Sequence, residues 1–370
     1  MMENHLEGTQ KGRPRNIVSE PVSLGELHSG AVHIKTDRFG QVFEAALASG
    51  LFLLSLVILY SCDLVLATPL PAMGRFAALF ALIVIQSALM TQMVMQFHDC
   101  LHFAVFRRAG FNTALARGIG AYCLWPATFL RESHLQHHRR AGLVDGDPEV
   151  LHFTAEFIER NSWAAGLNRL AQTRWAPLLF TPALQGIHFT RYFRLKLLVK
   201  RDISALGAYV GEIVLMVATW ALITRFLKLP LHSYFVGHLL PSLIAMGLVY
   251  WAAKPLHTQM IGIPLPELDL AARTLSVARS FKSNRMVRLF FANLGFHIEH
   301  HLRPSVSRWA LPSLAESLRP ELEKLAREKQ LPFAYHHSYR SWYREVGKRV
   351  PTQNTISTLD EWNIQNTTRV

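Results

Sequence analysis

Four long apolar stretches constrain the fold of this 370-residue chain more than any other feature of its sequence. A helix needs about 20 predominantly apolar residues to cross the roughly 30 Å hydrocarbon core of a bilayer. The stretches that meet this requirement are residues 45–68, 76–97, 203–224 and 232–253. Because a segment inside the bilayer must satisfy its backbone hydrogen bonds internally, each stretch predicts a transmembrane α-helix.

Composition and charge agree with an integral membrane protein. Hydrophobic residues make up 50% of the chain and charged residues 18%, below the roughly 25% of ordinary globular domains. The net charge is +13, but the basic residues are spread between the apolar stretches rather than gathered in a stripe with aromatic residues. This distribution favours contact with anionic lipid headgroups, and we expect no nucleic-acid partner.

The linkers predict how the spans are connected. Short linkers that contain proline, residues 69–75 and 225–231, join the first pair and the last pair of stretches, which predicts two helical hairpins. Basic residues lie near the ends of the segment between the pairs and in both terminal regions, so both termini and the middle segment are expected to be cytosolic. Residues 111–130 contain Arg117, which favours a re-entrant or interfacial helix over a fifth span.

The expected fold class is all-α and integral to the membrane, with four transmembrane helices in two hairpins and a cytosolic helical cap. We expect a polar cytosolic arm over residues 1–40, a membrane domain over 41–318 and a cytosolic tail over 319–370. Asp63 and Glu212 lie inside spans, where an ionisable group is a functional hypothesis by default. Either group could equally face a partner helix or lie near the interface.

Three short histidine runs carry the chemistry of the sequence. They are His98-Asp99-Cys100-Leu101-His102, His134-Leu135-Gln136-His137-His138 and His297-Ile298-Glu299-His300-His301. Residues spaced i, i+3 and i+4 share one side of a helix, so the imidazoles of each run are expected to point at one place. Their number exceeds the roughly three protein ligands of a zinc hydrolase, which indicates two ions or one crowded site. Imidazole suits iron, copper and zinc alike, so spacing alone does not choose the metal.

Two other classes of protein remain as alternatives. The first run resembles the HExxH helix of zinc proteases, with Asp99 in place of the glutamate, but that reading leaves the other two runs unexplained. A metal transporter or sensor without catalytic activity is the remote alternative. A transporter buries its polar ligands at mid-span, whereas these runs lie outside the apolar stretches.

The residues around the runs resemble the membrane fatty acid desaturase family, which also includes hydroxylases and carotenoid-modifying enzymes. The segments that carry the resemblance are Trp125-Pro126 and Phe129-Leu130-Arg131 before the second run, Asp147-Pro148-Glu149 after it, and Asn293 to Pro304 with Leu311-Pro312 around the third. The resemblance extends over residues 41–318 and is most specific at the third run.

This resemblance implies a non-haem di-iron centre on the cytosolic side that activates dioxygen and removes hydrogen from an unactivated carbon. The ligands that it implies are His98, His102, His134, His137, His138, His257, His297, His300 and His301. His257 is the ninth ligand, just after the last span, and Lys254 stands where relatives often have an acid. Acidic neighbours could orient these rings, and Asp99, Asp147 and Glu299 are the candidates.

The resemblance favours desaturation of a fatty acyl chain. Hydroxylation or ketolation of a lipid, a carotenoid or another apolar compound remains open, because these reactions share the metal site. Each turnover needs two electrons, and the sequence shows no haem segment, iron–sulfur cysteine set or dinucleotide-binding glycine fingerprint. The electrons are therefore expected from an external carrier: a ferredoxin, a rubredoxin or a b-type cytochrome with its reductase.

Overall fold

The structure, a computed structural model, describes residues 38–141, 203–257, 270–281, 283–329, 331 and 335–336. These residues are almost entirely helical, and a short parallel pair, β1 (Ser280–Phe281) with β2 (Tyr335–His336), is the strand structure found among them. The predicted all-α class is confirmed. Asp147 lies outside the described residues, as does the side chain of Lys254.

Four helical segments are long and apolar enough to cross a membrane, and each coincides with one of the predicted stretches to within one residue at its C-terminal end or contains it. They are α2 (Arg38–Ala67), α3 (Ala72–Leu101), α9 (Ile203–Leu227) and the continuous segment Leu231–Ala253. The last segment comprises α10 (Leu231–Tyr234), the π-helix η2 (Phe235–Leu239) and most of α11 (Leu240–His257). The prediction of an integral membrane protein with four spans agrees with these helices.

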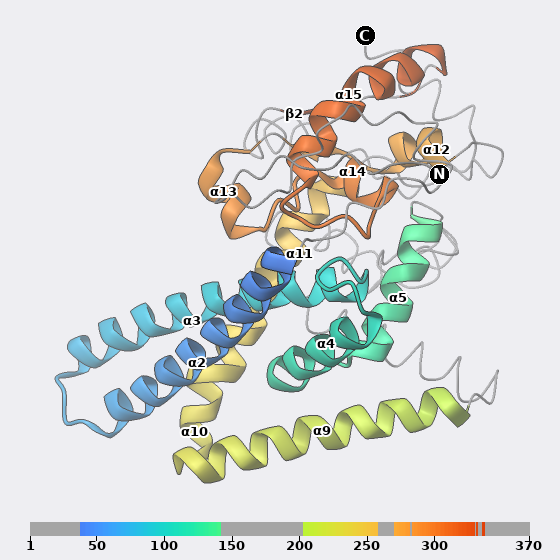
Figure 1. Cartoon of the computed structure of the whole chain (residues 1–370). Helices are drawn as coiled ribbons and strands as arrows, with labels where there is room; N and C mark the ends of the chain where they lie inside the picture. Colours follow the sequence, from blue (N-terminus) through green and yellow to red (C-terminus); the bar gives the residue numbers. More distant parts are fainter. Residues whose placement is uncertain are drawn as a thin grey trace, which may run out of the picture.

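The spans do not all pack on their sequence neighbours (Figure 1). Helix α2 lies along α3, and α11 also packs against α3. Helix α9 packs instead against α4 (Ala109–Cys123) and α5 (Ala127–Arg140). With 15 residues, α4 is too short for a span, which agrees with the prediction that this region is not a fifth span. The two-hairpin arrangement and its orientation in the membrane stay predictions.

The C-terminal helices form a second core beside the ends of α3 and α11. Helix α15 (Leu311–Glu328) buries Leu314, Leu318 and Leu322 at helical spacing, against α12 (Leu270–Val277) and α14 (His297–Leu302). Because α15 continues unbroken past residue 318, its first and last turns share this core. The division of the chain at 40 and 318 stays a prediction.

Helix α13 (Arg285–Phe290) joins these C-terminal helices to the membrane helices. Asn284 caps its first turn by accepting a hydrogen bond from the backbone N–H of Val287 at 2.9 Å. At its other end, the Gln92 amide of α3 donates to the backbone carbonyls of Leu289 and Phe290. The third histidine run, in α14, is thereby held beside the end of α3.

The two ionisable groups inside spans both face partner elements. Asp63 accepts a hydrogen bond from the hydroxyl of buried Ser233, in α10, at 2.6 Å. Glu212 of α9 accepts from the backbone N–H and the hydroxyl of Thr128, at 3.0 and 2.6 Å, and from Arg117 at 3.3 Å. Asp63 therefore ties the first span to the fourth, and Glu212 ties the third span to α4 and α5.

Glu212 acts as the cap of α5, the helix that carries the second histidine run. The residue at the N-cap position is Pro126, which makes no side-chain hydrogen bond to the first turn. A helix start leaves unsatisfied N–H groups and a partial positive charge, and a carboxylate placed there satisfies both. The sequence before α5 lacks such a group, so a distant helix supplies it.

We expect Glu212→Leu to destabilise the protein by about 1–3 kcal/mol, because it leaves the Thr128 N–H and Arg117 without their acceptor. Glu212→Gln keeps one acceptor and is expected to cost less. The measurement is the thermal midpoint in detergent, with Glu316→Leu on the exposed face of α15 as the matched control. A Glu212→Leu variant as stable as the wild type would contradict this capping role.

Gly237 sets how closely η2 approaches α2. A Cβ atom placed there would lie 2.8 Å from Leu59 Cδ1 and 3.1 Å from Cys62 Cβ, so a larger side chain would push the two helices apart. We expect Gly237→Val to cost about 1–3 kcal/mol in stability through overpacking. Gly50→Val in α2, where nothing lies within 4 Å of the added Cβ, is the control and should retain the wild-type thermal midpoint.

Candidate metal centre

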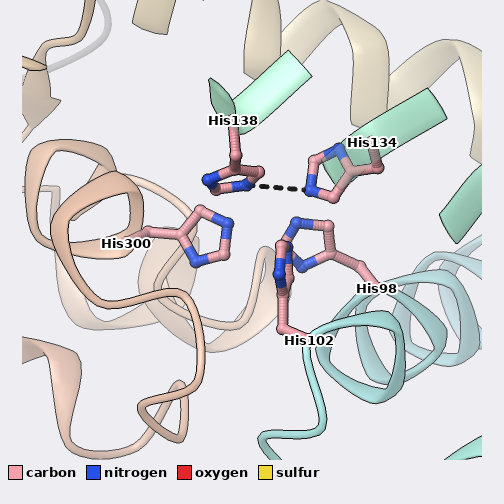
Figure 2. A group of neighbouring side chains, drawn as sticks. All are labelled: His98, His102, His134, His138 and His300. Atoms are coloured by element: carbon pink, nitrogen blue, oxygen red, sulfur yellow. Dashed lines mark hydrogen bonds between the residues drawn. The ribbon is translucent and has the colours of Figure 1, made fainter. Parts of the chain in front are cut away.

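All nine histidines that the sequence singles out lie among the described residues, and the structure gathers them into two groups. The five-histidine group consists of His98, His102, His134, His138 and His300, and the four-histidine group of His137, His257, His297 and His301. Within each group the candidate ligand atoms all lie within 4.8 Å of one another. Figure 2 shows the five-histidine group, whose rings converge from α3 and its C-cap residue His102, from α5 and from α14.

The expectation that each run points at one place is wrong for two of the three runs. In the second run, His134 and His138 enter the five-histidine group, and His137 enters the other. The third run divides the other way: His297 and His301 enter the four-histidine group, and His300 enters the five-histidine group. At 3.6 residues per turn, neighbours at i+3 and i+4 point about 100° apart, so one short run serves two positions.

The ends of the helices are fixed so that the first two runs meet. Arg131 of α5 donates from Nε to the carbonyl of Leu101, the last residue of α3, at 3.1 Å, and its guanidinium lies over the Phe103 ring. Beyond His102, buried Asn112 of α4 accepts from the backbone N–H groups of Val105 and Phe106. These contacts hold the chain on both sides of His102.

The spacing of the ring nitrogens fits metal coordination. In the four-histidine group, His257 Nε2 lies 3.1 Å from His137 Nε2 and 2.7 Å from His297 Nε2. His297 Nε2 also lies 3.2 Å from His301 Nε2. A neutral imidazole carries one N–H, so this set cannot be satisfied by hydrogen bonds alone. Nitrogens about 2.1 Å from one ion and near 90° apart lie roughly 3 Å from each other.

Burial favours the protonation state that binds metal. It lowers the pKa of His102, His138 and His300 well below the usual range, and the neighbouring imidazoles lower it further. His297 and His301 have their pKa shifted in the same direction for the same reason. Neutral imidazole is the metal-binding form. Both ring nitrogens of His102 and Nε2 of His300 are buried without a hydrogen-bond partner, as expected of ligand atoms.

Two of the rings are oriented by a second contact. His98 Nδ1 lies 3.3 Å from the carboxylate of Asp99, and His257 Nδ1 lies 2.8 Å from the backbone carbonyl of Val277. Such contacts fix which nitrogen faces a metal. Of the predicted acidic neighbours that are described, Asp99 makes this kind of contact.

Glu299 has a different place. Its carboxyl is fully buried and accepts from the Ser280 hydroxyl at 2.7 Å, which ties α14 to β1. Burial raises the pKa of Glu299 to about 7. Ser280 and Val277 carry no pattern that would have marked them in the sequence, because they act through a short strand and a backbone carbonyl.

Comparison with known proteins supports one assignment. A family model described as fatty acid desaturase matches residues 73–334, well over half of the chain, and this range contains all nine histidines. No curated protein matches the chain by sequence. The matched range ends at residue 334, whereas the resemblance found in the sequence ends at residue 318. It begins at residue 73, inside α3, whereas that resemblance begins at residue 41. The chain belongs to the fatty acid desaturase family.

Proposed function

We propose that the chain is a membrane-bound, dioxygen-dependent di-iron desaturase that introduces a double bond into the acyl chain of a lipid. Membership of the family makes it an oxidoreductase, and a lipid acyl substrate and a membrane setting follow from the same membership. The observation that carries the di-iron proposal is the pair of histidine groups, each of which could hold one metal ion.

The two groups adjoin each other, as a dinuclear centre requires. The rings of His138, in the five-histidine group, and His301, in the four-histidine group, stack with centroids 4.1 Å apart. His297 and His300 also lie face to face across the groups, at 5.6 Å. The residues present could therefore hold two ions in one centre.

Iron in these groups would supply the cleavage of dioxygen and of an unactivated C–H bond, which side chains alone cannot perform. The chain's residues hold the rings, fix their tautomers and exclude water. His137, His297 and His301 are all buried, so most of the four-histidine group is shielded from solvent. The five-histidine group begins in the last turn of α3, an apolar helix, which supports the proposal that an acyl chain in the bilayer reaches it.

The partners and the orientation belong to the same proposal. An external carrier, such as a ferredoxin, a rubredoxin or a b-type cytochrome with its reductase, would deliver two electrons in each turnover. The basic residues near the span ends support cytosolic termini and a cytosolic metal site. Hydroxylation or ketolation of a lipid or carotenoid is the alternative, since the same centre serves either outcome.

Metal analysis tests the ligand assignment. We expect the purified protein to carry close to one iron for each histidine group. His102→Ala and His301→Ala should each reduce the iron content, because each removes a buried ligand from a different group. His232→Ala, at an exposed histidine in neither group, is the control and should bind iron like the wild type. Full occupancy by zinc alone, with activity intact, would overturn the di-iron proposal.

Lipid profiling tests the reaction. A host that expresses the wild-type chain should accumulate acyl lipids lighter by two hydrogen atoms, and a host that expresses His137→Ala should not. Products heavier by one oxygen atom would assign hydroxylation instead, and those in which a methylene has become a carbonyl would assign ketolation. If iron is bound but no lipid class changes, the acyl-lipid substrate is wrong for that host.

A further inference from the structure

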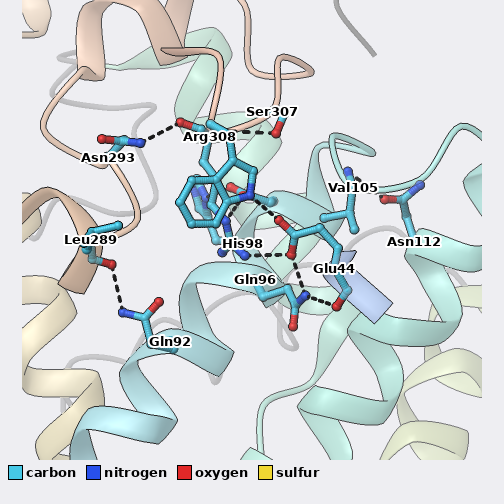
Figure 3. Close-up of polar contacts among 12 residues, drawn as sticks. Glu44, Gln92, Gln96, His98, Val105, Asn112, Leu289, Asn293, Ser307 and Arg308 are labelled. Carbon is cyan, nitrogen blue, oxygen red and sulfur yellow. Dashed lines mark hydrogen bonds and ion pairs between the residues drawn. The ribbon is translucent and has the colours of Figure 1, made fainter. Parts of the chain in front are cut away.

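A buried chain of charged groups leads from Glu44, in α2, through Arg308 to the neighbourhood of His98 (Figure 3). Arg308 lies in the loop between α14 and α15, and its side chain is 2% exposed. Its Nη2 donates to Glu44 Oε2, in α2, at 2.7 Å. On its other side, its Nε lies 3.5 Å from Asp99 Oδ2. We refer to Glu44, Arg308 and Asp99 as the Arg308 network.

Further hydrogen bonds hold Glu44 and the backbone of Arg308. Glu44 also accepts hydrogen bonds from Gln96 Nε2 and from Trp309 Nε1, both at 2.6 Å. The backbone carbonyl of Arg308 accepts from the Asn293 amide at 2.9 Å. Arg308 thus lies between two carboxylates, hydrogen-bonded to Glu44 and in a longer ion pair with Asp99. Burying such charges is costly, and replacing them with apolar side chains is often neutral for stability, so stability alone gives little reason for this arrangement.

The network ends on a candidate ligand. Asp99 directs Oδ2 at Arg308 and Oδ1 at His98 Nδ1, 3.3 Å away. With Nδ1 engaged, Nε2 is the nitrogen that His98 can offer to a metal. A carboxylate behind a ligand imidazole fixes its orientation and increases its basicity. The ring of His257, in the four-histidine group, has a neutral carbonyl at the same position.

We propose that Arg308 is a positioning residue for the metal of the five-histidine group: it holds the Asp99 carboxylate against His98, and Glu44 holds Arg308 in place. The proposal rests on the proposed metal centre. It assigns to a loop residue outside the three histidine runs a role in metal affinity at one of the two positions. A purely structural role would instead weaken both positions together with the fold.

The test is a double-mutant cycle on iron affinity, read by chelator competition on the iron-loaded protein. Arg308→Met and Asp99→Asn should each weaken one of the two iron-binding steps by about 10–100-fold and leave the other step unchanged. The weakened step, whether the tighter or the looser one, should be the same in both variants. In the Asp99→Asn background, Arg308→Met should add almost nothing, because Arg308 acts through Asp99. Mössbauer spectra should change for one iron position and not for the other.

The matched control is Arg117→Met. Arg117 also pairs with a carboxylate of a membrane helix, Glu212, but it contacts no histidine of either group among the described interactions. It should lower the thermal midpoint without changing either iron-binding step. Arg308→Lys keeps the charge but lacks the forked guanidinium that reaches two carboxylates. This variant should retain the fold but lose most of the iron affinity that Arg308 contributes through Asp99.

The outcomes separate the two proposals. If the wild type binds no iron, the proposed metal centre fails. If it binds iron but Arg308→Met weakens both steps equally, or if its effect adds to that of Asp99→Asn, the positioning role is wrong. Should Arg308→Met fail to accumulate, Arg308→Lys and Glu44→Gln carry the same comparison, and wild-type affinity in both would overturn the proposal.

Discussion

The mutual packing of nine imidazoles, six of them buried and three half-buried, is the constraint on which the rest of the structure depends. Uncharged rings whose Nε2 atoms lie 2.7–3.2 Å apart have too few protons to satisfy one another, and burial disfavours adding more. A metal ion bound in each group would resolve this conflict, because it would accept a lone pair from each ring of that group. The surrounding contacts, from Arg131 on the end of α3 to Ser280 on Glu299, serve to hold four separate helices at the distance that this arrangement requires.

Much of this could be read from the sequence, because it depends on local patterns. Span length and apolarity located the four membrane helices, and short-range histidine spacing located every member of both groups except His257. The division of the histidine runs between the two groups could not be predicted from the sequence. Helix geometry allows this division, but it depends on the positions of the partner helices. His257 needed the family resemblance, because a single histidine after a span has no spacing to mark it.

The contacts that hold the site in place could not be predicted from the sequence for a related reason. Glu212 and Thr128 lie 84 residues apart, and Glu44 and Arg308 lie 264 apart. For Glu212 and Asp63, an ionisable residue inside an apolar stretch left open a partner helix or a place near the interface, and only the structure identifies their partners. Arg308 gave no signal, since an arginine in a polar loop is ordinarily exposed.

The position of Glu44 links the metal centre to the first span. Glu44 lies in the second turn of α2, ahead of the predicted start of the first apolar stretch, and it is only 2% exposed because Gln96, Arg308 and Trp309 surround it. Helix α2 contributes no histidine to either group. It nevertheless supplies the carboxylate that pairs with Arg308, so the loop between α14 and α15 is tied to α2 as well as to the end of α3. The packing of α2 against α3 therefore bears on the proposed metal site, although α2 supplies none of its candidate ligands.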